Sequence, residues 1–111
     1  MAAYAQALQA LGDPTRRTIF EHLVDRPRAV HELADELPVT RPAVSQHLRV
    51  LKDAGLVTQH AVGRRRLYRV DPHGLEELHA YVEGFWLRAL DDFKVAADER
   101  PDDKDGARVI G

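Results

Sequence analysis

Residues 40–57 read TRPAVSQHLRVLKDAGLV, and this stretch predicts a helix with one apolar and one polar face. Thr40 is a suitable N-cap for that helix, and a proline is tolerated in its first turn. Three apolar residues recur at i, i+4 and i+7 and therefore share one face: Val44, Leu48 and Leu51. Gly55 follows as the left-handed residue that ends such a helix, and Leu56 is then placed to pack back on Leu51.

A second, shorter helix is expected just before this one, at residues 31–37. Pro38 ends it, because proline disfavours a helical conformation in the residue before it. The residues that this short helix should bury are Leu33, Ala34 and Leu37. Only Pro38, Val39 and Thr40 separate the two helices, and so short a link between short helices is typical of a helix-turn-helix.

After Gly55 the pattern becomes that of a β-hairpin. The segment LVTQHAVGRRRLYRV at 56–70 has the valines, the aromatic residue and the central glycine that favour two short strands and a turn. Its loop carries three consecutive arginines: Arg64, Arg65 and Arg66. Like charges this close repel one another, and a phosphate backbone or a DNA minor groove would relieve that repulsion.

The polar face of the helix at 41–54 carries side chains of the types that read DNA. At about 100° per residue, Gln46 and Arg49 point away from the apolar face, with Ser45 at the side. Glutamine pairs with adenine and arginine with guanine in the major groove, whereas residues at the helix N-terminus suit a phosphate. His47 lies at the shoulder of the apolar face, where we expect it to pack or to be hydrogen-bonded. The candidate DNA-binding residues are Thr40, Arg41, Ser45, Gln46, Arg49, Lys52, Arg64, Arg65 and Arg66.

The rest of the chain is expected to be helical. Residues 2–11 predict a short amphipathic helix, and Asp13-Pro14 begins another that runs to about Asp25. The residues that this second helix should turn inward are Ile19, Phe20, Leu23 and Val24. Asp71-Pro72 opens a last helix with a broad apolar stripe. We expect residues 1–98 to form one domain and the polar segment 99–111 to be a disordered acidic tail.

The formal net charge of −2 is unevenly distributed along the chain. From Arg41 to Arg69 there are seven arginines and lysines and one acid, which gives a local charge of +6. From Asp91 to Asp105 there are seven acids and three bases, which gives a local charge of −4. Because local charge decides what a face attracts, the basic stretch is compatible with a nucleic-acid partner.

Composition excludes several classes of function. The 111 residues, 44% of them hydrophobic, suffice for one small domain with a modest core. The absence of cysteine excludes disulfides, thiol catalysis and thiolate metal sites. The start MAAYAQALQALGDPTRR does not resemble a signal peptide, and no apolar stretch approaches the roughly 20 residues of a membrane span, so we expect a soluble, cytoplasmic protein. Without a glycine-rich phosphate loop or a nucleophile motif, we expect neither an enzyme nor a cofactor.

Five segments together resemble the ArsR/SmtB family of bacterial winged helix-turn-helix repressors, and within it the SdpR-like branch, whose members lack the known metal sites. The segments are DPTRRTIFEHL, ELADEL, TRPAVSQHLRVLKDAGLV, GRRRLYRV and the FW of the last helix. The resemblance covers about residues 4–95. It implies a mostly helical fold with a small β-hairpin wing, and a homodimer that represses a promoter by occupying it. We expect the operator to be an inverted repeat, with a recognition helix in each major groove and the wings on the backbone or minor groove.

The resemblance also implies a dimer interface formed by the first and last helices. That implication agrees with an apolar stripe larger than so small a core needs. The residues expected in the interface are Tyr4, Leu8, Leu11, Leu78, Val82, Phe85, Trp86, Leu90 and Phe93.

Two alternatives remain beside the operator-binding repressor. One is a metal-responsive repressor, because Asp71-Pro72-His73 matches half of a metal site known in the family. The second half is missing, since only His79 follows, and HELADEL has no cysteine for another family site, so we predict no metal. The other alternative is a dimeric module of the same fold that binds a partner protein and has lost operator binding. The sequence leaves open whether an inducer exists and whether it is a small ligand or a protein.

Overall fold

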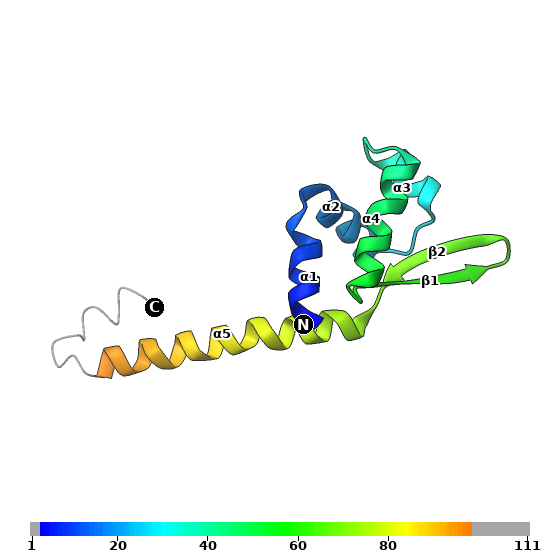
Figure 1. Ribbon diagram of the computed structural model, residues 1–111. Coiled ribbons are helices and arrows are strands. Elements are labelled where there is room, and N and C mark those ends of the chain that lie inside the picture. The colour runs from blue at the N-terminus through cyan, green and yellow to red at the C-terminus, as the bar shows by residue number, and fades with distance from the viewer. Residues whose placement is uncertain (1–2, 99–111) are drawn as a thin grey trace. The chain divides into compact units, whose positions relative to one another are not determined.

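Five helices and one β-hairpin make up the part of the chain that the computed structural model describes, residues 3–98 (Figure 1). In order, they are α1 (Ala3–Gly12), α2 (Pro14–Asp25), α3 (Val30–Glu36), α4 (Arg41–Asp53), β1 (Val57–Val62), β2 (Arg65–Val70) and α5 (Pro72–Asp98). This confirms the predicted mostly helical, winged helix-turn-helix architecture. The chain divides into two compact units between His79 and Ala80, so only the first turns of α5 belong to the same unit as the other elements.

The predicted domain boundaries remain predictions. The division at His79 is one of compactness within the fold. The predicted acidic tail at 99–111 lies outside the described residues.

The core of the first unit is formed by the apolar faces of the helices together with the start of β1. Its fully buried large side chains are Ile19, Leu33, Val44, Leu48, Leu51, Leu56 and Val57. Ala34 and Leu37 pack against this core but are only half-buried. The prediction that Val24 faces inward was wrong: it is 60% exposed, because it follows the buried Leu23 and is turned about 100° further around α2.

The corner between α1 and α2 is held by polar contacts at both helix ends. Asp13 accepts a hydrogen bond from the backbone N–H of Arg16 at 3.0 Å, which lowers the pKa of its carboxyl and caps α2 as predicted. Arg16 Nε donates to the carbonyl of Ala10 at 2.6 Å, and Arg17 donates to the carbonyl of Leu11 at 3.0 Å. The last carbonyls of α1 therefore find partners on α2, which fixes the two helices to each other.

A glycine ends α4 and turns the chain into the wing. Gly55 has a φ of 78°; its N–H donates to the carbonyl of Lys52 and that of Leu56 to the carbonyl of Leu51, both at 3.0 Å. These are the two hydrogen bonds of a Schellman motif, and they confirm the predicted end of the helix. The start of α5 lies against the same turn. A Cβ added to Gly74 would lie 2.0 Å from the carbonyl oxygen of Gly55.

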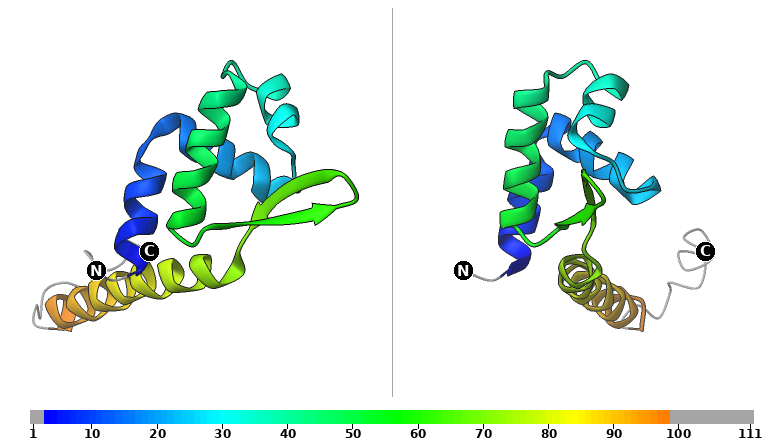
Figure 2. Two further views of the ribbon diagram at one scale, coloured as in Figure 1. Left: turned by 45° about the vertical axis from the view of Figure 1, so that its right-hand side comes forward. Right: turned by 90° about the vertical axis from the view of Figure 1, so that its right-hand side faces the viewer.

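The wing is an antiparallel hairpin in which Val57 pairs with Val70 and Val62 with Arg65. Only Gly63 and Arg64 separate the strands, and the φ of 62° at Gly63 is the conformation that the first position of a type II′ turn requires. Figure 2 shows the hairpin extending from the end of α4 beyond the helices of the first unit. The sequence therefore places its arginines at the far end of a projecting hairpin.

The second unit, from Ala80 onward, consists of the rest of α5 as far as it is described. Its large exposed apolar side chains are Val82, Phe85, Trp86, Leu87, Leu90, Phe93 and Val95. Phe85 makes an edge-on contact with Tyr81, with ring centroids 4.8 Å apart, and the guanidinium of Arg88 lies 5.1 Å from the Phe85 centroid. None of the helices in residues 3–98 is long and apolar enough to cross a membrane.

Candidate nucleic-acid interface

The helix-turn-helix consists of α3 and α4, which lie side by side and are joined by residues 37–40 (Figure 2). Thr40 caps α4 as predicted, since its hydroxyl accepts a hydrogen bond from the N–H of Ala43 at 3.3 Å. The three apolar residues of the predicted face, Val44, Leu48 and Leu51, are completely buried. Their burial fixes the rotation of α4 about its axis and so decides which side chains it presents to the outside.

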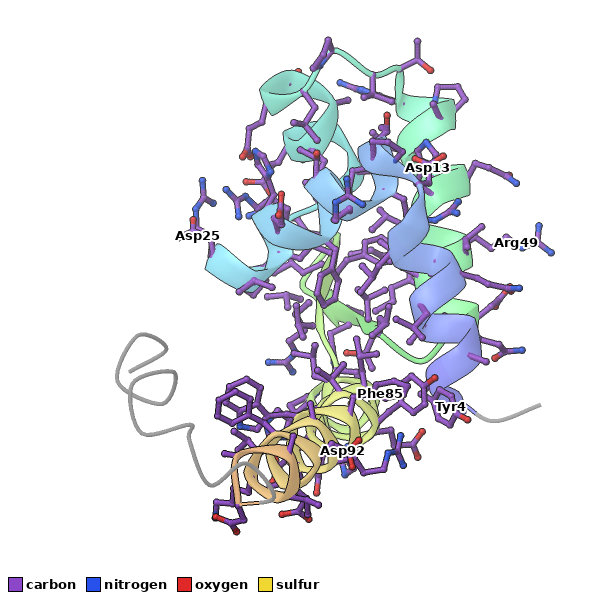
Figure 3. All side chains as sticks on the ribbon, turned by 90° about the vertical axis from the view of Figure 1, so that its left-hand side faces the viewer. Tyr4, Asp13, Asp25, Arg49, Phe85 and Asp92 are labelled. Atoms are coloured by element: carbon purple, nitrogen blue, oxygen red, sulfur yellow. The ribbon has the colours of Figure 1, made fainter. Side chains whose placement is uncertain are left out.

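The opposite face of α4 is polar and open to a partner. Besides Asp53, its exposed polar side chains are the five predicted DNA-binding residues Arg41, Ser45, Gln46, Arg49 and Lys52. Within residues 3–98 none of these five side chains makes a hydrogen bond or an ion pair. Figure 3 labels Arg49, whose side chain extends away from the helices. The predicted recognition face is therefore brought together on one surface with its donors and acceptors unused.

His47 differs from its neighbours on α4. It is half-buried, and its Nδ1 atom is buried without a hydrogen-bond partner among the described residues. This is the shoulder position that the helical periodicity assigns to it. It packs against the protein rather than projecting with Gln46 and Arg49.

The three arginines of the wing have different surroundings, although all are exposed. Arg65 donates to Glu32 of α3, with 2.6 Å between Nη2 and Oε1. Arg64, in the turn, and Arg66 have no ion pair within the described part of the chain. Sequence reasoning treated the three arginines as equivalent, but one of them already has a carboxylate partner.

Glu32 connects the wing to the helix-turn-helix. Its carboxylate accepts a hydrogen bond from the N–H of Ala29 at 2.9 Å, at the start of α3, as well as the one from Arg65. These contacts lower the pKa of Glu32, the Ala29 N–H contributing most and Arg65 next among the favourable interactions. The hairpin is thus fastened to α3 by a charged pair.

Arg28 forms a second connection, which the sequence did not reveal. It is only 5% exposed, and its guanidinium pairs with both carboxylate oxygens of Glu36, at 2.8 and 3.1 Å. It also donates to the carbonyl of Arg26 at 3.0 Å and to that of His22. Its backbone pairs with Tyr68 of β2 through hydrogen bonds of 2.8 and 3.1 Å. One buried, well-paired arginine therefore joins α2, α3 and the wing.

The half-motif Asp71-Pro72-His73 serves as a helix start. Asp71 accepts a hydrogen bond from the N–H of His73 at 3.0 Å, and the His73 ring lies 3.3 Å from the same oxygen. Among residues 3–98 there is no group of three or more histidine, aspartate or glutamate side chains that could hold a metal ion. In this structure, then, Asp71 has the capping role that the sequence assigned to it.

The residues predicted to form a dimer interface fall into two groups. Six are exposed: Leu8, Val82, Phe85, Trp86, Leu90 and Phe93. Three are half-buried: Tyr4, Leu11 and Leu78. Leu11 packs against the core of the first unit, so its burial already has an intrachain explanation.

Comparisons with known proteins agree with this geometry. A family described as a helix-turn-helix domain matches residues 11–60. The HTH-type transcriptional regulator Rv2034 of Mycobacterium tuberculosis is 52% identical over 98 residues, covering 88% of this chain and 92% of that protein. The HTH-type transcriptional repressor SmtB of the same species is 46% identical over 76 residues, covering 68% of this chain and 56% of the relative.

A solved structure gives the same result for the fold. It is the homodimeric winged helix-turn-helix DNA-binding domain of Mb0332 from Mycobacterium bovis, described as a possible ArsR-family transcriptional regulator. It matches with a TM-score of 0.63 and 28% identity, covering 90% of this chain and 82% of that one.

Proposed function

Because the chain belongs to the ArsR/SmtB family of winged helix-turn-helix transcriptional regulators, we propose that it is a repressor that binds an inverted-repeat operator as a homodimer. Such a repressor acts in the cytoplasm, where bacterial DNA lies. It blocks transcription by occupying the promoter and needs no cofactor to do so.

The observation that carries this proposal is the exposed, unpartnered polar face of α4. A helix fixed by three buried apolar residues presents Gln46 and Arg49 outward, where they can pair with adenine and guanine edges in a major groove. Thr40 and Arg41 at the helix N-terminus are placed for a phosphate, with Ser45 and Lys52 on the flanks. The wing supports the proposal, because Arg64 and Arg66 are exposed cations at the end of a projecting hairpin.

The homodimer is inferred from α5 and from the solved relative. The exposed stripe of α5 includes Trp86, which is 62% exposed, and Phe85, which is 48% exposed. Burying such side chains contributes about 1.5–3 kcal/mol each. Mb0332 carries the same fold as a homodimer. A dimer brings two recognition helices to two half-sites, which are about one or two turns of DNA apart in the expected operator.

The test is selection of bound duplexes from a random DNA pool by the purified protein. We expect enrichment of an inverted repeat. Gln46→Ala or Arg49→Ala should then weaken discrimination at one base position of each half-site by about 1–3 kcal/mol. Glu21→Ala, a change at an exposed position of α2 outside the polar face of α4 and the wing, serves as the control and should leave the selected sequence unchanged.

Two results would contradict the proposal. If no sequence is enriched and binding to DNA is flat between 50 and 200 mM salt, the fold serves a partner protein instead. If Gln46→Ala and Arg49→Ala both select the wild-type sequence with wild-type discrimination, DNA is read by another face of the molecule.

A further inference from the structure

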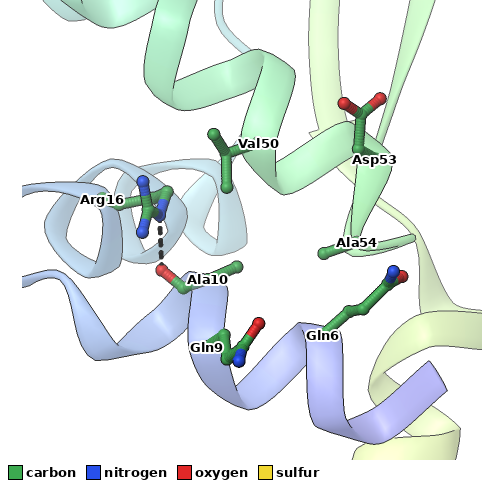
Figure 4. A pocket seen from close by; sticks show the side chains of 7 residues that line it. All are labelled: Gln6, Gln9, Ala10, Arg16, Val50, Asp53 and Ala54. Carbon is green, nitrogen blue, oxygen red and sulfur yellow. Dashed lines mark hydrogen bonds between the residues drawn. The ribbon is translucent and has the colours of Figure 1, made fainter. Parts of the chain in front are cut away.

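A pocket of about 290 Å³ lies beside α4, where that helix faces α1 (Figure 4). It is open to solvent and is lined by α1, the first turn of α2 and the C-terminal end of α4, all within the first unit. Its lining residues are Gln6, Gln9, Ala10, Arg16, Val50, Asp53 and Ala54. A volume near the lower end of the range for ligand sites, about 300–1,000 Å³, suits a small molecule.

The walls of the pocket carry opposite charges at opposite ends. Figure 4 shows Arg16 at one end and Asp53 at the other, with the amides of Gln6 and Gln9 along the side that α1 provides. Arg16 Nε donates a hydrogen bond to the carbonyl of Ala10, and this contact holds the guanidinium beside the pocket. No described residue forms a hydrogen bond with its two Nη groups, with the Asp53 carboxylate or with either amide.

The floor between these charged ends is apolar. It is formed by the small or branched side chains of Ala10, Val50 and Ala54. The pocket thus has a cation at one end, an apolar floor and an anion at the other end. A molecule of complementary charge carries an anionic group and a cationic group, joined by a short hydrocarbon chain.

We propose that this pocket binds a small zwitterion, with its carboxylate on Arg16, its ammonium group on Asp53 and a short aliphatic chain between them. The guanidinium of Arg16 suits a carboxylate, because it offers parallel donors. The two glutamines supply neutral donors and acceptors for whatever polar atoms lie along the chain.

If the proposed repressor function holds, on which this step rests, the ligand tightens operator binding. Asp53 follows Arg49 by one helical turn on α4, so its carboxylate repels the phosphates that the polar face approaches. An ammonium group paired with Asp53 removes that repulsion. The ligand carboxylate neutralises Arg16, but Arg16 lies on α2 and is not part of the polar face of α4. Its neutralisation therefore removes no positive charge from that face. The ligand also bridges Arg16 on α2 to Asp53 at the end of α4 and so restrains α4.

Titration calorimetry of the full chain with 4-aminobutanoate, 5-aminopentanoate and 6-aminohexanoate tests the site. We expect one ligand per chain and an affinity that peaks at one chain length. Butanoate and butylamine, which each carry a single charge, should bind at least about tenfold more weakly. Asp53→Asn and Arg16→Gln should each cause a similar loss, whereas Asp35→Asn on α3 should bind like the wild type.

The possible outcomes test the pocket, its regulatory effect and the proposed repressor function separately. The site is overturned if none of the three zwitterions binds, or if Asp53→Asn binds them as well as the wild type does. Operator affinity is measured with and without the best-binding zwitterion. Binding of the zwitterion with no rise in operator affinity overturns the regulatory step. Failure of the unliganded protein to bind any operator overturns the proposed function, while the calorimetry still decides the pocket.

Discussion

Gly74 and Gly84 both lie inside α5, but their surroundings differ. A Cβ at position 74 would lie 2.0 Å from the backbone oxygen of Gly55, whereas one at position 84 would meet nothing within 4 Å. Gly74→Ala should therefore destabilise the protein by about 2 kcal/mol or more, because backbone must move to make room. Gly84→Ala should stabilise it by up to about 1 kcal/mol, because alanine is the better helix former. Urea unfolding of the two variants measures both values.

Equal changes in stability for Gly74→Ala and Gly84→Ala would contradict this prediction. If Gly74→Ala unfolds at the wild-type urea concentration, α5 does not begin against the turn at Gly55.

The ion pair between Arg28 and Glu36 makes stability depend on pH. The hydrogen bonds from Arg28 hold the pKa of the Glu36 carboxyl below its usual range, so the folded state favours the charged form. This contribution is fully present above the ordinary glutamate pKa of about 4.3 and is lost as the pH falls through the lower folded value. The urea midpoint should hold steady down to about pH 5 and then drop.

Glu36→Gln isolates that contribution. The variant should be less stable than the wild type at pH 7, and the difference between the two should shrink below about pH 4. Asp35→Asn, a change at an exposed position of α3, should leave the urea midpoint at pH 7 close to that of the wild type. A constant gap between wild type and Glu36→Gln from pH 7 to pH 3 would show that the pair does not titrate with unfolding.

At the scale of elements, we expect the three wing arginines to contribute unequally to the salt dependence of DNA binding. Each phosphate contact adds about 0.9 to the slope of log affinity against log salt, so Arg64→Gln and Arg66→Gln should each lower that slope by about one. Arg65→Gln should lower it by less, because Glu32 already neutralises Arg65 in the free protein. Filter binding to one operator between 50 and 200 mM salt gives the slopes. Equal slopes for the three variants would mean that Arg65 exchanges Glu32 for a phosphate.

The elements themselves were largely predictable, because their ends depend on local chemistry. Thr40 and Asp13 cap helices through their own side chains, and Gly55 takes a positive φ that few other residues adopt. The inward placement of Val24 failed because the buried face of α2 is narrower than predicted, and Val24 is turned about 100° from the buried Leu23. The observed ends of the helices differ from the predicted ends by only a residue or so.

The contacts between elements were not predictable in the same way. Arg28 pairs with Glu36, which lies 8 positions later in the sequence, and Arg65 pairs with Glu32, from which it is 33 positions away. The available signal was two glutamates one turn apart on α3, which could equally have faced solvent. The polar face of α4 followed from periodicity, but which of the wing arginines is already paired depends on the angle of the hairpin to α3.

At the scale of the whole molecule, the proposed dimer should depend on one face of α5. Trp86 lies on the apolar stripe, whereas Leu87, with a similar exposure of 53%, is turned about 100° away from it. Trp86→Glu should therefore give a monomer, because a buried, unpaired carboxylate is costly in an apolar interface. Leu87→Glu should remain a dimer. Sedimentation velocity at micromolar concentration distinguishes these states, and a dimer of Trp86→Glu would place the interface elsewhere.

The turn at Gly55 and Leu56 has a mechanical consequence for the regulator. The same two residues follow the end of α4, precede β1 and contact the start of α5, through the close approach of Gly74 and a 2.8 Å hydrogen bond that the Asp71 N–H donates to the carbonyl of Leu56. Three elements therefore meet at one turn. We therefore expect a shift at the start of α5 to displace the end of α4 and the start of the hairpin together.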